Sequence, residues 1–480
     1  MFRVSLRERP LYSPALHSAE YASQRGYWQE HVGYEISESQ AEQMRQAVSE
    51  LSSMFKQAMN YVVANPEVLR QFFMHPDEYQ NHCVLQLARQ SWLDEGIRDT
   101  VLERLDMAWD GINPPKLLER NLGHMGLIVG TGPVQEKYIA WLRKQPGFSD
   151  ANSFGDLEEA LIQSFQNVAW QMFLPRGGRV AVIAQNKTPK SDRGMLAAPR
   201  LLTRWARKAG FNASRVVADT LNYDQITGAM VAFTAFGQRK SEKFADLERR
   251  IFKGNISQRV FSSISIARSI QAQHAYTFFA GDYYMYNLAQ SSKNGVPPDG
   301  LKTRTMDPYW VLLAHNKALL AVLHELFPDH PNLLPTYIGT RELKDQKRIF
   351  KRMYGSQGNE SVIVNENNDI VNVRNVRGGG RLWSEESYVT QAFTEAAAGS
   401  FGRYRVFNVF ATQGKAAAMS VREAPGPFVG GDDTKTQLLP VIVRPDDVIA
   451  ELGRTKDADP SRSTFFMNLI IGNFTDELKF

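Results

Sequence analysis

The sequence predicts a mixed protein of α+β and α/β class, and three changes of pattern along its 480 residues indicate this. The first 150 residues show mainly helical periodicity, interrupted by one stretch that resembles a hairpin. Strand and helix patterns then alternate up to about residue 306, which is typical of a parallel sheet. From residue 307 a leucine-rich helix is followed by strands and glycine turns. We therefore expect three regions, at 1–150, 151–306 and 307–480.

In the first region, two short patterns predict where helices begin. Ser37 and Gln40 have the spacing of a capping box, with Ile36 in place for a hydrophobic staple, before an amphipathic run that continues through Val62. The combination Asn65-Pro66-Glu67 suits the N-terminus of a further helix.

The hairpin-like stretch runs from RLDMAW through WDGINPP to KLLERN. Alternate side chains of a strand share a face, so Arg104 lies with Asp106, and Glu119 lies with Asn121. The intervening turn-forming residues predict a hairpin loop. A hairpin symmetrical about positions 112 and 113 sets Asp106 opposite Glu119 and Arg104 opposite Asn121.

Two carboxylates that face each other across a strand pair repel, and something must offset this repulsion. One interpretation is a surface cluster of ion pairs around Arg104. The other is a hard divalent cation, because Mg²⁺ favours a few carboxylate and amide oxygens together with water and substrate phosphate. The spacing alone leaves both possibilities open.

The second region contains a strand–helix–strand pattern. RVAVIAQ at 179–185 has the character of a buried strand, RLLTRWARKAG that of a helix, and SRVVADTL that of another strand. This order predicts an α/β unit with parallel strands.

The third region begins with a predicted helix from Asn316 to Phe327, ended by Pro328. After it, IFKRMYGSQGNESVIV places Lys351 on a strand before a loop that contains Gly355, Ser356 and Gly358. Backbone N–H groups of such a loop and a nearby lysine can hold phosphate oxygens. The same pattern also fits an ordinary hairpin with a glycine turn, and GGGR at 378–381 fits a plain turn.

Composition limits the possible partners. The chain has 56 basic and 51 acidic residues, and a net charge of +5 over this length permits a nucleotide ligand but gives no reason to expect DNA or RNA. Its only cysteine, Cys83, lies in an apolar helical pattern and excludes an intrachain disulfide. The N-terminus lacks an apolar signal core, and no apolar run reaches 18 residues. We expect a cytoplasmic protein with no membrane partner.

The order of these patterns resembles the synthetase of the glutathionylspermidine synthase family, which has an ATP-grasp fold. The most specific match is DPYWVLLAHNKALLAVLHELFPDHPNLLP, beside which RLD and KLLERN are similar to the family's R-x-D and Y-E-Y-N. The resemblance covers most of positions 100–425. It implies a helical N-terminal segment with the hairpin at 100–123, a pre-ATP-grasp α/β region and a C-terminal ATP-grasp region.

The resemblance also implies an ATP- and Mg²⁺-dependent ligase, which joins a small-molecule or peptide carboxylate to an amine through an acyl phosphate. It implies that Mg²⁺ is held by Asp106, Glu119 and Asn121. It implies that Arg104 and Arg422 face the transferring phosphoryl group. The residues it implies for ATP binding are Lys351, Lys317, Gln391 and the lid-loop residues Gly355, Ser356 and Gly358.

Several departures from the family pattern leave a second function open. Thr277 and Ser356 stand where the family has basic residues, and each lost charged hydrogen bond weakens binding by about 1.5 to 3 kcal/mol unless Lys317, Arg352 or Lys415 compensates. The family's cysteine–histidine amidase half has no counterpart. The alternative to a ligase is therefore a catalytically degenerate ATP-grasp-like protein with a binding or structural role.

Overall fold

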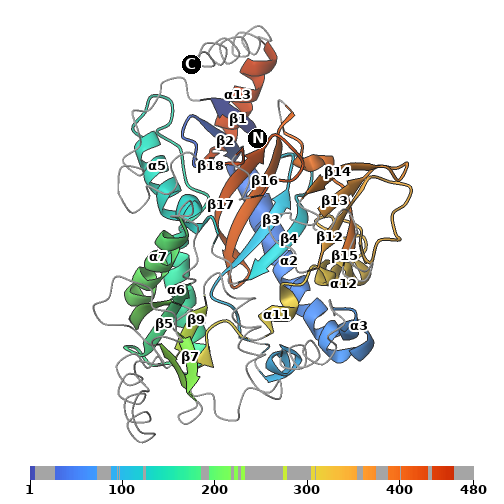
Figure 1. Ribbon diagram of the computed structural model, residues 1–480. Helices are drawn as coiled ribbons and strands as arrows, with labels where there is room; N and C mark the ends of the chain where they lie inside the picture. Colours follow the sequence, from blue (N-terminus) through green and yellow to red (C-terminus); the bar gives the residue numbers. More distant parts are fainter. Residues whose placement is uncertain are drawn as a thin grey trace, which may run out of the picture.

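The computed structural model describes most of the chain, in these ranges: 1–5, 27–72, 88–94, 96, 98–122, 126–184, 194–217, 221–224, 229–232, 274–277, 304–308, 310–353, 361–374, 388–399, 402–430 and 435–458. Cys83, the loop residues Gly355, Ser356 and Gly358, and the 378–381 turn lie outside these ranges. The described chain is a mixed α+β structure with two large sheets, a smaller parallel sheet and a two-stranded ribbon (Figure 1).

A seven-stranded sheet forms the centre of the molecule (Figure 1). Only the β18–β2 pair is parallel, and the other neighbouring pairs are antiparallel. The sheet joins strands from both ends of the sequence, including two near the N-terminus that helical periodicity did not predict. In spatial order the strands are β1 (Phe2–Ser5), β2 (Val32–Ser37), β18 (Gln437–Arg444), β17 (Lys415–Ala424), β16 (Tyr404–Thr412), β3 (Glu103–Ala108) and β4 (Lys116–Leu122).

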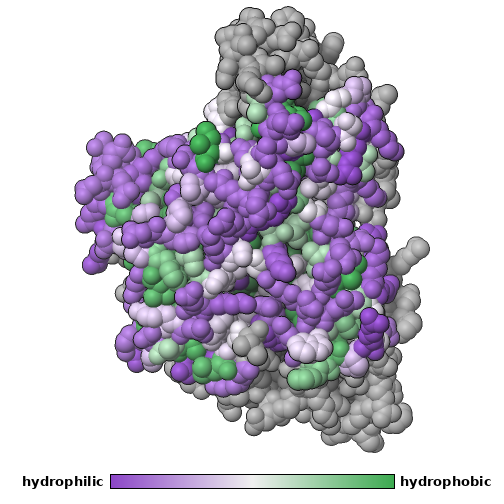
Figure 2. Space-filling view, turned by 180° about the vertical axis from the view of Figure 1, so that it is seen from behind, coloured by the Kyte–Doolittle hydropathy of each residue, from purple (hydrophilic) through white to green (hydrophobic). Residues whose placement is uncertain are grey.

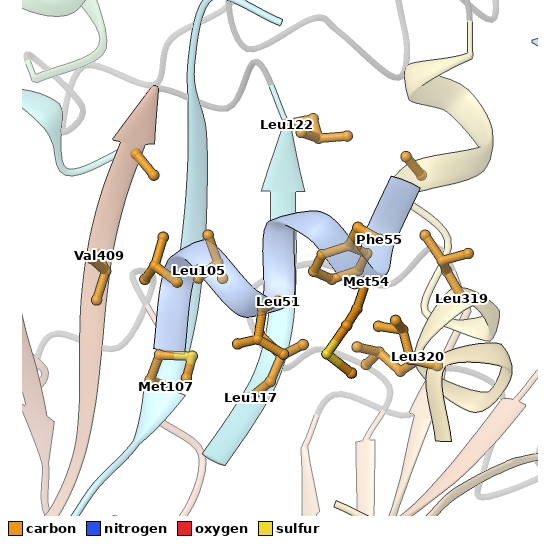
Figure 3. Close-up of a cluster of buried hydrophobic side chains, with 14 of the residues drawn as sticks. Leu51, Met54, Phe55, Leu105, Met107, Leu117, Leu122, Leu319, Leu320 and Val409 are labelled. Atoms are coloured by element: carbon orange, nitrogen blue, oxygen red, sulfur yellow. The ribbon is translucent and has the colours of Figure 1, made fainter. Parts of the chain in front are cut away.

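The long helix α2 (Glu38–Ala64) covers one face of this sheet. Leu51 and Phe55 of α2 pack with Leu105 of β3 and Val409 of β16, and α12 (Ala318–Leu326) adds Leu319 to the same core (Figure 3). Burying each such side chain contributes about 1.5 to 3 kcal/mol. The apolar residues alternate along the strands, so the intervening side chains must point to the opposite face.

The predicted start of α2 is confirmed. The Ser37 side chain accepts a hydrogen bond from the backbone N–H of Gln40, and the Gln40 side chain accepts one from the backbone N–H of Ser37. Helix α3 (Pro66–Arg70) also begins where predicted, although the Asn65 side chain donates to the carbonyl of Tyr61 instead of capping α3.

The opposite face of the central sheet is divided in two. Part of it is apolar and packs against η2 (Gly130–Val134), α5 (Gln135–Leu142) and α6 (Leu157–Gln171); the strand residues here include Phe410 and Ala418. The remainder carries the polar residues of the predicted site. Strand β16 contributes to each part of this face. Its residues Tyr404 and Val406 line a cleft, Asn408 lies in the polar cluster, and Phe410 packs in the apolar core.

The predicted strand–helix–strand unit of the second region is confirmed. Strands β5 (Arg179–Ala184) and β6 (Asn212–Val217) are parallel, and α7 (Gly194–Lys208) lies between them in sequence. The four-stranded parallel sheet is completed by β9 (His274–Thr277) and β10 (Arg304–Thr305). A separate ribbon is formed by β7 (Leu221–Asp224) and β8 (Ala229–Ala232).

A five-stranded antiparallel sheet lies beside β4 on the other side of the molecule (Figure 1). The predicted lysine strand is its middle strand, and the predicted helix after Asn316 is α12, which follows α11 (Val311–Ala314). In order the strands are β11 (Thr336–Ile338), β15 (Tyr388–Ala392), β12 (Arg348–Arg352), β13 (Ser361–Val364) and β14 (Ile370–Arg374). The short η5 (Glu395–Ala397) precedes β16 in the sequence, and helix α13 (Asp446–Ala458) follows β18.

The face shown in Figure 2 carries mainly hydrophilic side chains, with hydrophobic ones in small separate patches. Among the helices that the structure describes, none combines the length and apolar character needed to cross a membrane. The bounds at 150 and 306 stay a prediction, since the central sheet draws on the first and the last of the three regions.

Candidate active site

The β3–β4 hairpin has the register that the sequence predicts at the candidate site. Asp106 pairs with Glu119, and Arg104 pairs with Asn121. Beyond Asp106 a bulge shifts the register by one residue, so that Met107 pairs with Leu117. Residues that pair directly across antiparallel strands point to the same face, so both carboxylates lie on the polar part of the sheet.

Asp106 is the centre of a buried hydrogen-bond cluster and only 2% exposed. Its Oδ1 accepts from Nε of Arg104 at 2.7 Å and from Nδ2 of Asn408 at 2.9 Å. Its Oδ2 accepts from the Arg104 guanidinium at 3.0 Å and from that of Arg422 at 2.7 Å. A carboxylate offers about four acceptor positions, and these contacts fill them.

Asn408 was not predicted from the sequence. It is fully buried on β16, where its Nδ2 donates to Asp106 and its Oδ1 accepts from Nε of Arg422 at 3.0 Å. Asn408 thus fixes the relative positions of an acid and a base from two other strands. A signal was present, because Asn is the single polar residue within the apolar run VFNVFA and buried polar groups need partners.

Glu119 lies at the edge of the cluster. Its Oε1 accepts from Nδ2 of Asn121 at 3.2 Å, and its Oε2 forms an ion pair with Nζ of Lys317 at 3.3 Å. Burial raises the pKa of Glu119, but the charges of Lys317, Arg104 and Lys351 outweigh burial and hold this pKa below its usual range. Glu119 is therefore ionised at neutral pH.

Lys351 projects from β12 toward Gln391 on the neighbouring strand. Its Nζ donates to Oε1 of Gln391 at 2.6 Å and to the carbonyl of Leu118 at 3.0 Å. Burial lowers the pKa of Lys351 to about 8; Lys317 lowers it too, whereas Glu119 and Asp106 raise it. Gln391 is itself held by Thr336, to whose Oγ1 it donates at 3.2 Å.

These residues line one cleft between the two large sheets. The cleft contains about 880 Å³ of empty space, including its opening to solvent. One end is polar and the other is formed by apolar and aromatic side chains. The polar residues that line it include Asp106, Glu119, Lys317, Lys351, Gln391 and Arg422; the apolar residues include Ile349, Phe393, Tyr404, Val406 and Phe428.

The polar end of the cleft is positively charged overall. Four basic side chains surround two carboxylates there, which leaves a net charge of +2 from these six residues. Basic groups in excess inside a partly enclosed cleft attract anions. The six residues are Arg104, Lys317, Lys351, Arg422, Asp106 and Glu119.

A divalent cation at this site would need oxygen ligands from Asp106, Glu119 and Asn121. Within the described residues, no group of three His, Cys, Asp or Glu side chains is placed to hold a metal. Glu119 and Asn121 do fit a hard cation in chemistry, since they carry a carboxylate and an amide oxygen on one strand face, although Asn121 turns its amide nitrogen toward Glu119 and would have to rotate its amide to present the oxygen. Asp106 would contribute only when an arginine leaves one of its oxygens.

The structure brings together eight of the eleven residues that the sequence singled out. Six line the cleft, Arg104 binds Asp106, and Asn121 binds Glu119. The other three, Gly355, Ser356 and Gly358, lie outside the described residues. Thr277 is on β9 of the parallel sheet. At the apolar end, Phe428 was not predicted, whereas the family resemblance implies that the segment from Tyr388 to Phe393 lies beside the adenine.

Fold and cleft define a class of mixed α+β protein with a basic cleft between two sheets. The chain belongs to the glutathionylspermidine synthase family: the family model described as "Glutathionylspermidine synthase preATP-grasp" matches residues 8–258 and 279–443.

Individual proteins also match this chain, at low sequence identity. A Haemophilus influenzae protein named "Putative acid--amine ligase" is 23% identical over 415 residues, which cover 85% of this chain and 89% of that protein. A glutathione synthetase-like effector from Globodera pallida, solved without ligand, matches with a TM-score of 0.47 and 9% identity over 85% of this chain and 88% of its own.

Proposed function

We propose that the protein is an ATP- and Mg²⁺-dependent carboxylate–amine ligase, similar to the synthetase of its family, with an ATP-grasp arrangement around the cleft. The observation that carries this proposal is the pair of opposed carboxylates, Asp106 and Glu119, which line one cleft with Lys317, Lys351 and Arg422, while Arg104 binds Asp106. Membership of the family and the acid–amine ligase name of the Haemophilus influenzae relative support it.

ATP lies along the cleft in this proposal, with its base toward the apolar end near Phe393 and its phosphates at the polar end. Lys351 and Lys317 are cationic donors that contact the phosphates, and Gln391 holds Lys351 in position. Gly355, Ser356 and Gly358, which lie outside the described residues, stay ATP-binding residues in this proposal, because backbone N–H groups of a glycine-containing turn can hold phosphate oxygens.

Glu119 and Asn121 would hold Mg²⁺, and Asp106 would join them only if its arginines released one of its oxygens. The chemistry that Mg²⁺ would supply there is the neutralisation of charge that develops during phosphoryl transfer. Arg104 and Arg422 are the donors closest to Asp106. In this proposal the two arginines contact the transferring phosphoryl group when they release Asp106.

The reaction proceeds in two balanced steps. A carboxylate oxygen of the acid attacks the γ-phosphorus, the bond from this phosphorus to the β–γ bridging oxygen breaks, and ADP leaves. The amine nitrogen then attacks the acyl carbon, loses a proton, and displaces phosphate to form the amide. The chain supplies positioning and electrostatic stabilisation to both steps.

Nucleotide binding with and without Mg²⁺ tests the proposal. The wild-type protein should bind ATP in the presence of Mg²⁺ and release ADP when a panel of peptides and amines includes its substrates. Glu119→Gln keeps the shape of the side chain but removes its charge, so metal-dependent binding should be lost while the fold remains. Unchanged binding by this variant would exclude the metal role of Glu119.

The alternative, a catalytically degenerate ATP-grasp-like protein, has its own support. The four acceptor positions of Asp106 are filled by protein groups, and Thr277 and Ser356 replace basic residues of the family. Such a protein would show no nucleotide binding at millimolar ATP with Mg²⁺, or would bind ATP without releasing ADP from any acid and amine of the panel.

A further inference from the structure

Tyr27 carries a buried hydroxyl group that the proposed mechanism has not used. Among the described residues, this oxygen has no hydrogen-bond partner. An unsatisfied buried hydroxyl costs about 1 to 3 kcal/mol, so such a group is expected to have a reason for its position.

The position of Tyr27 is fixed by strand β18. The backbone N–H of Leu438 donates to the Tyr27 carbonyl at 2.8 Å, and Trp28 forms a bridge with Leu438. Leu438 in turn pairs with Arg422 across β17 and β18. Tyr27 therefore lies beside β18, one strand away from β17, which carries Arg422.

The charges of the polar cluster act on the Tyr27 hydroxyl. Burial raises the pKa of Tyr27, Arg422 and Arg104 lower it, and Asp106 raises it. The arginines have no acceptor to offer a phenol, because a guanidinium only donates hydrogen bonds. Asp106 is the acid of this cluster, but its oxygens already accept four hydrogen bonds. The O–H of Tyr27 is a donor that lacks an acceptor.

We propose that Tyr27 is a substrate-binding residue, whose hydroxyl donates a hydrogen bond to an oxygen of the acid substrate held beside Arg104 and Arg422. This inference rests on the proposed function. Tyr27 lies on the β18 side of the arginines, whereas the proposed nucleotide contacts Lys351 and Gln391 come from the five-stranded sheet. The oxygen that meets Tyr27 accordingly belongs to the acyl part of the acyl phosphate.

Two simple probes separate the acyl oxygen from the phosphoryl oxygens. Acetyl phosphate is the smallest acyl phosphate, and inorganic phosphate has the same phosphoryl group without a carbonyl. Titration calorimetry of Tyr27→Phe with Mg²⁺ present should show about tenfold weaker binding of acetyl phosphate than the wild type. Binding of inorganic phosphate should stay unchanged. Equal losses for both probes would overturn the assignment to the acid.

Two further variants control the test. Tyr61→Phe makes the same chemical change on α2 and should bind both probes like the wild type. Tyr34→Phe removes a 2.7 Å hydrogen bond to Glu423 and should lower the unfolding midpoint, whereas Tyr27→Phe, which removes no such bond, should not.

The outcomes also separate this inference from the function on which it rests. If the wild type binds both probes and Tyr27→Phe binds them equally well, the role of Tyr27 is overturned and the ligase proposal stands. If the wild type binds neither probe nor ATP, both are overturned.

Discussion

Lys351 on β12 reaches across to the central sheet and donates a 3.0 Å hydrogen bond to the backbone carbonyl of Leu118 on β4. With its 2.6 Å bond to Gln391, this contact makes Lys351 a link between the two sheets that border the cleft. The amine is buried at this boundary, which lowers its pKa to about 8.

Nucleotide affinity should therefore fall as the pH rises through about 8. Lys351 carries a positive charge below this pKa and loses its proton above it, so its attraction for phosphate disappears in mild alkali. ATP titrations at about pH 7 and about pH 9.5 should show roughly a tenfold loss in the wild type. Lys351→Arg stays charged throughout, and an equally steep loss in this variant would contradict the prediction.

Asp106→Asn should destabilise the protein strongly. The variant leaves Arg104 and Arg422 buried without their shared countercharge, which costs about 3 to 5 kcal/mol in the free energy of unfolding. Urea denaturation measures this loss. Asp150→Asn is the matched control, because Asp150 is 29% exposed and its buried partner Arg444 keeps Glu35 as a second carboxylate, so this variant should cost at most about 1 kcal/mol. Similar losses in both variants would count against a buried charge cluster.

Mg²⁺ and nucleotide should bind with positive cooperativity. Without nucleotide, the acceptor positions of Asp106 are filled by arginine and asparagine donors, and the cluster has a net positive charge that repels a cation. In the proposed complex, bound phosphates would draw the arginines away and free the carboxylate. Calorimetry should detect weak Mg²⁺ binding alone and at least about fivefold tighter binding with a non-hydrolysable ATP analogue.

The reciprocal measurement should give the same factor, because coupling between two binding sites is symmetrical. Removing Mg²⁺ with a chelator should weaken binding of the analogue to the same extent. Tight Mg²⁺ binding to the nucleotide-free protein would show that the arginines do not block Asp106.

Ser37→Ala should lower the free energy of unfolding by about 1 kcal/mol, because it removes the side-chain half of the capping box of α2. Ser53→Ala, at an exposed position within the same helix, should have little effect or stabilise slightly. Denaturant midpoints of the two variants, measured side by side, test whether the cap contributes as its geometry indicates.

Local chemistry explains which features the sequence could predict. The register of the hairpin follows from the alternation of side chains and from a turn between positions 108 and 116, both of which are properties of neighbouring residues. The start of α2 and the parallel pair β5–β6 are local in the same sense. They were predicted with the correct bounds to within a few residues.

Long-range pairing explains what the sequence did not predict. Nothing near Asp106 indicates that β3 pairs with β16, which places Asn408 opposite it. Tyr27 was missed for the same reason, because its position depends on β18, far along the chain. Only the family resemblance led us to expect Asp106, Lys351 and Arg422 in one site. Their spacing along the sequence does not predict the distance between side chains on three separate strands.

The order of strands in the central sheet has a consequence for biosynthesis. Strands β3 and β4 leave the ribosome early, but β16, which covers the open edge of β3, is made only after residue 403. Until then the nascent chain presents an unpaired strand edge beside Asp106, whose partners Asn408 and Arg422 have not yet been made. Completion of the sheet is thus a late event. A chain terminated before β16 would lack strands β16, β17 and β18, and with them Asn408 and Arg422 of the polar cluster.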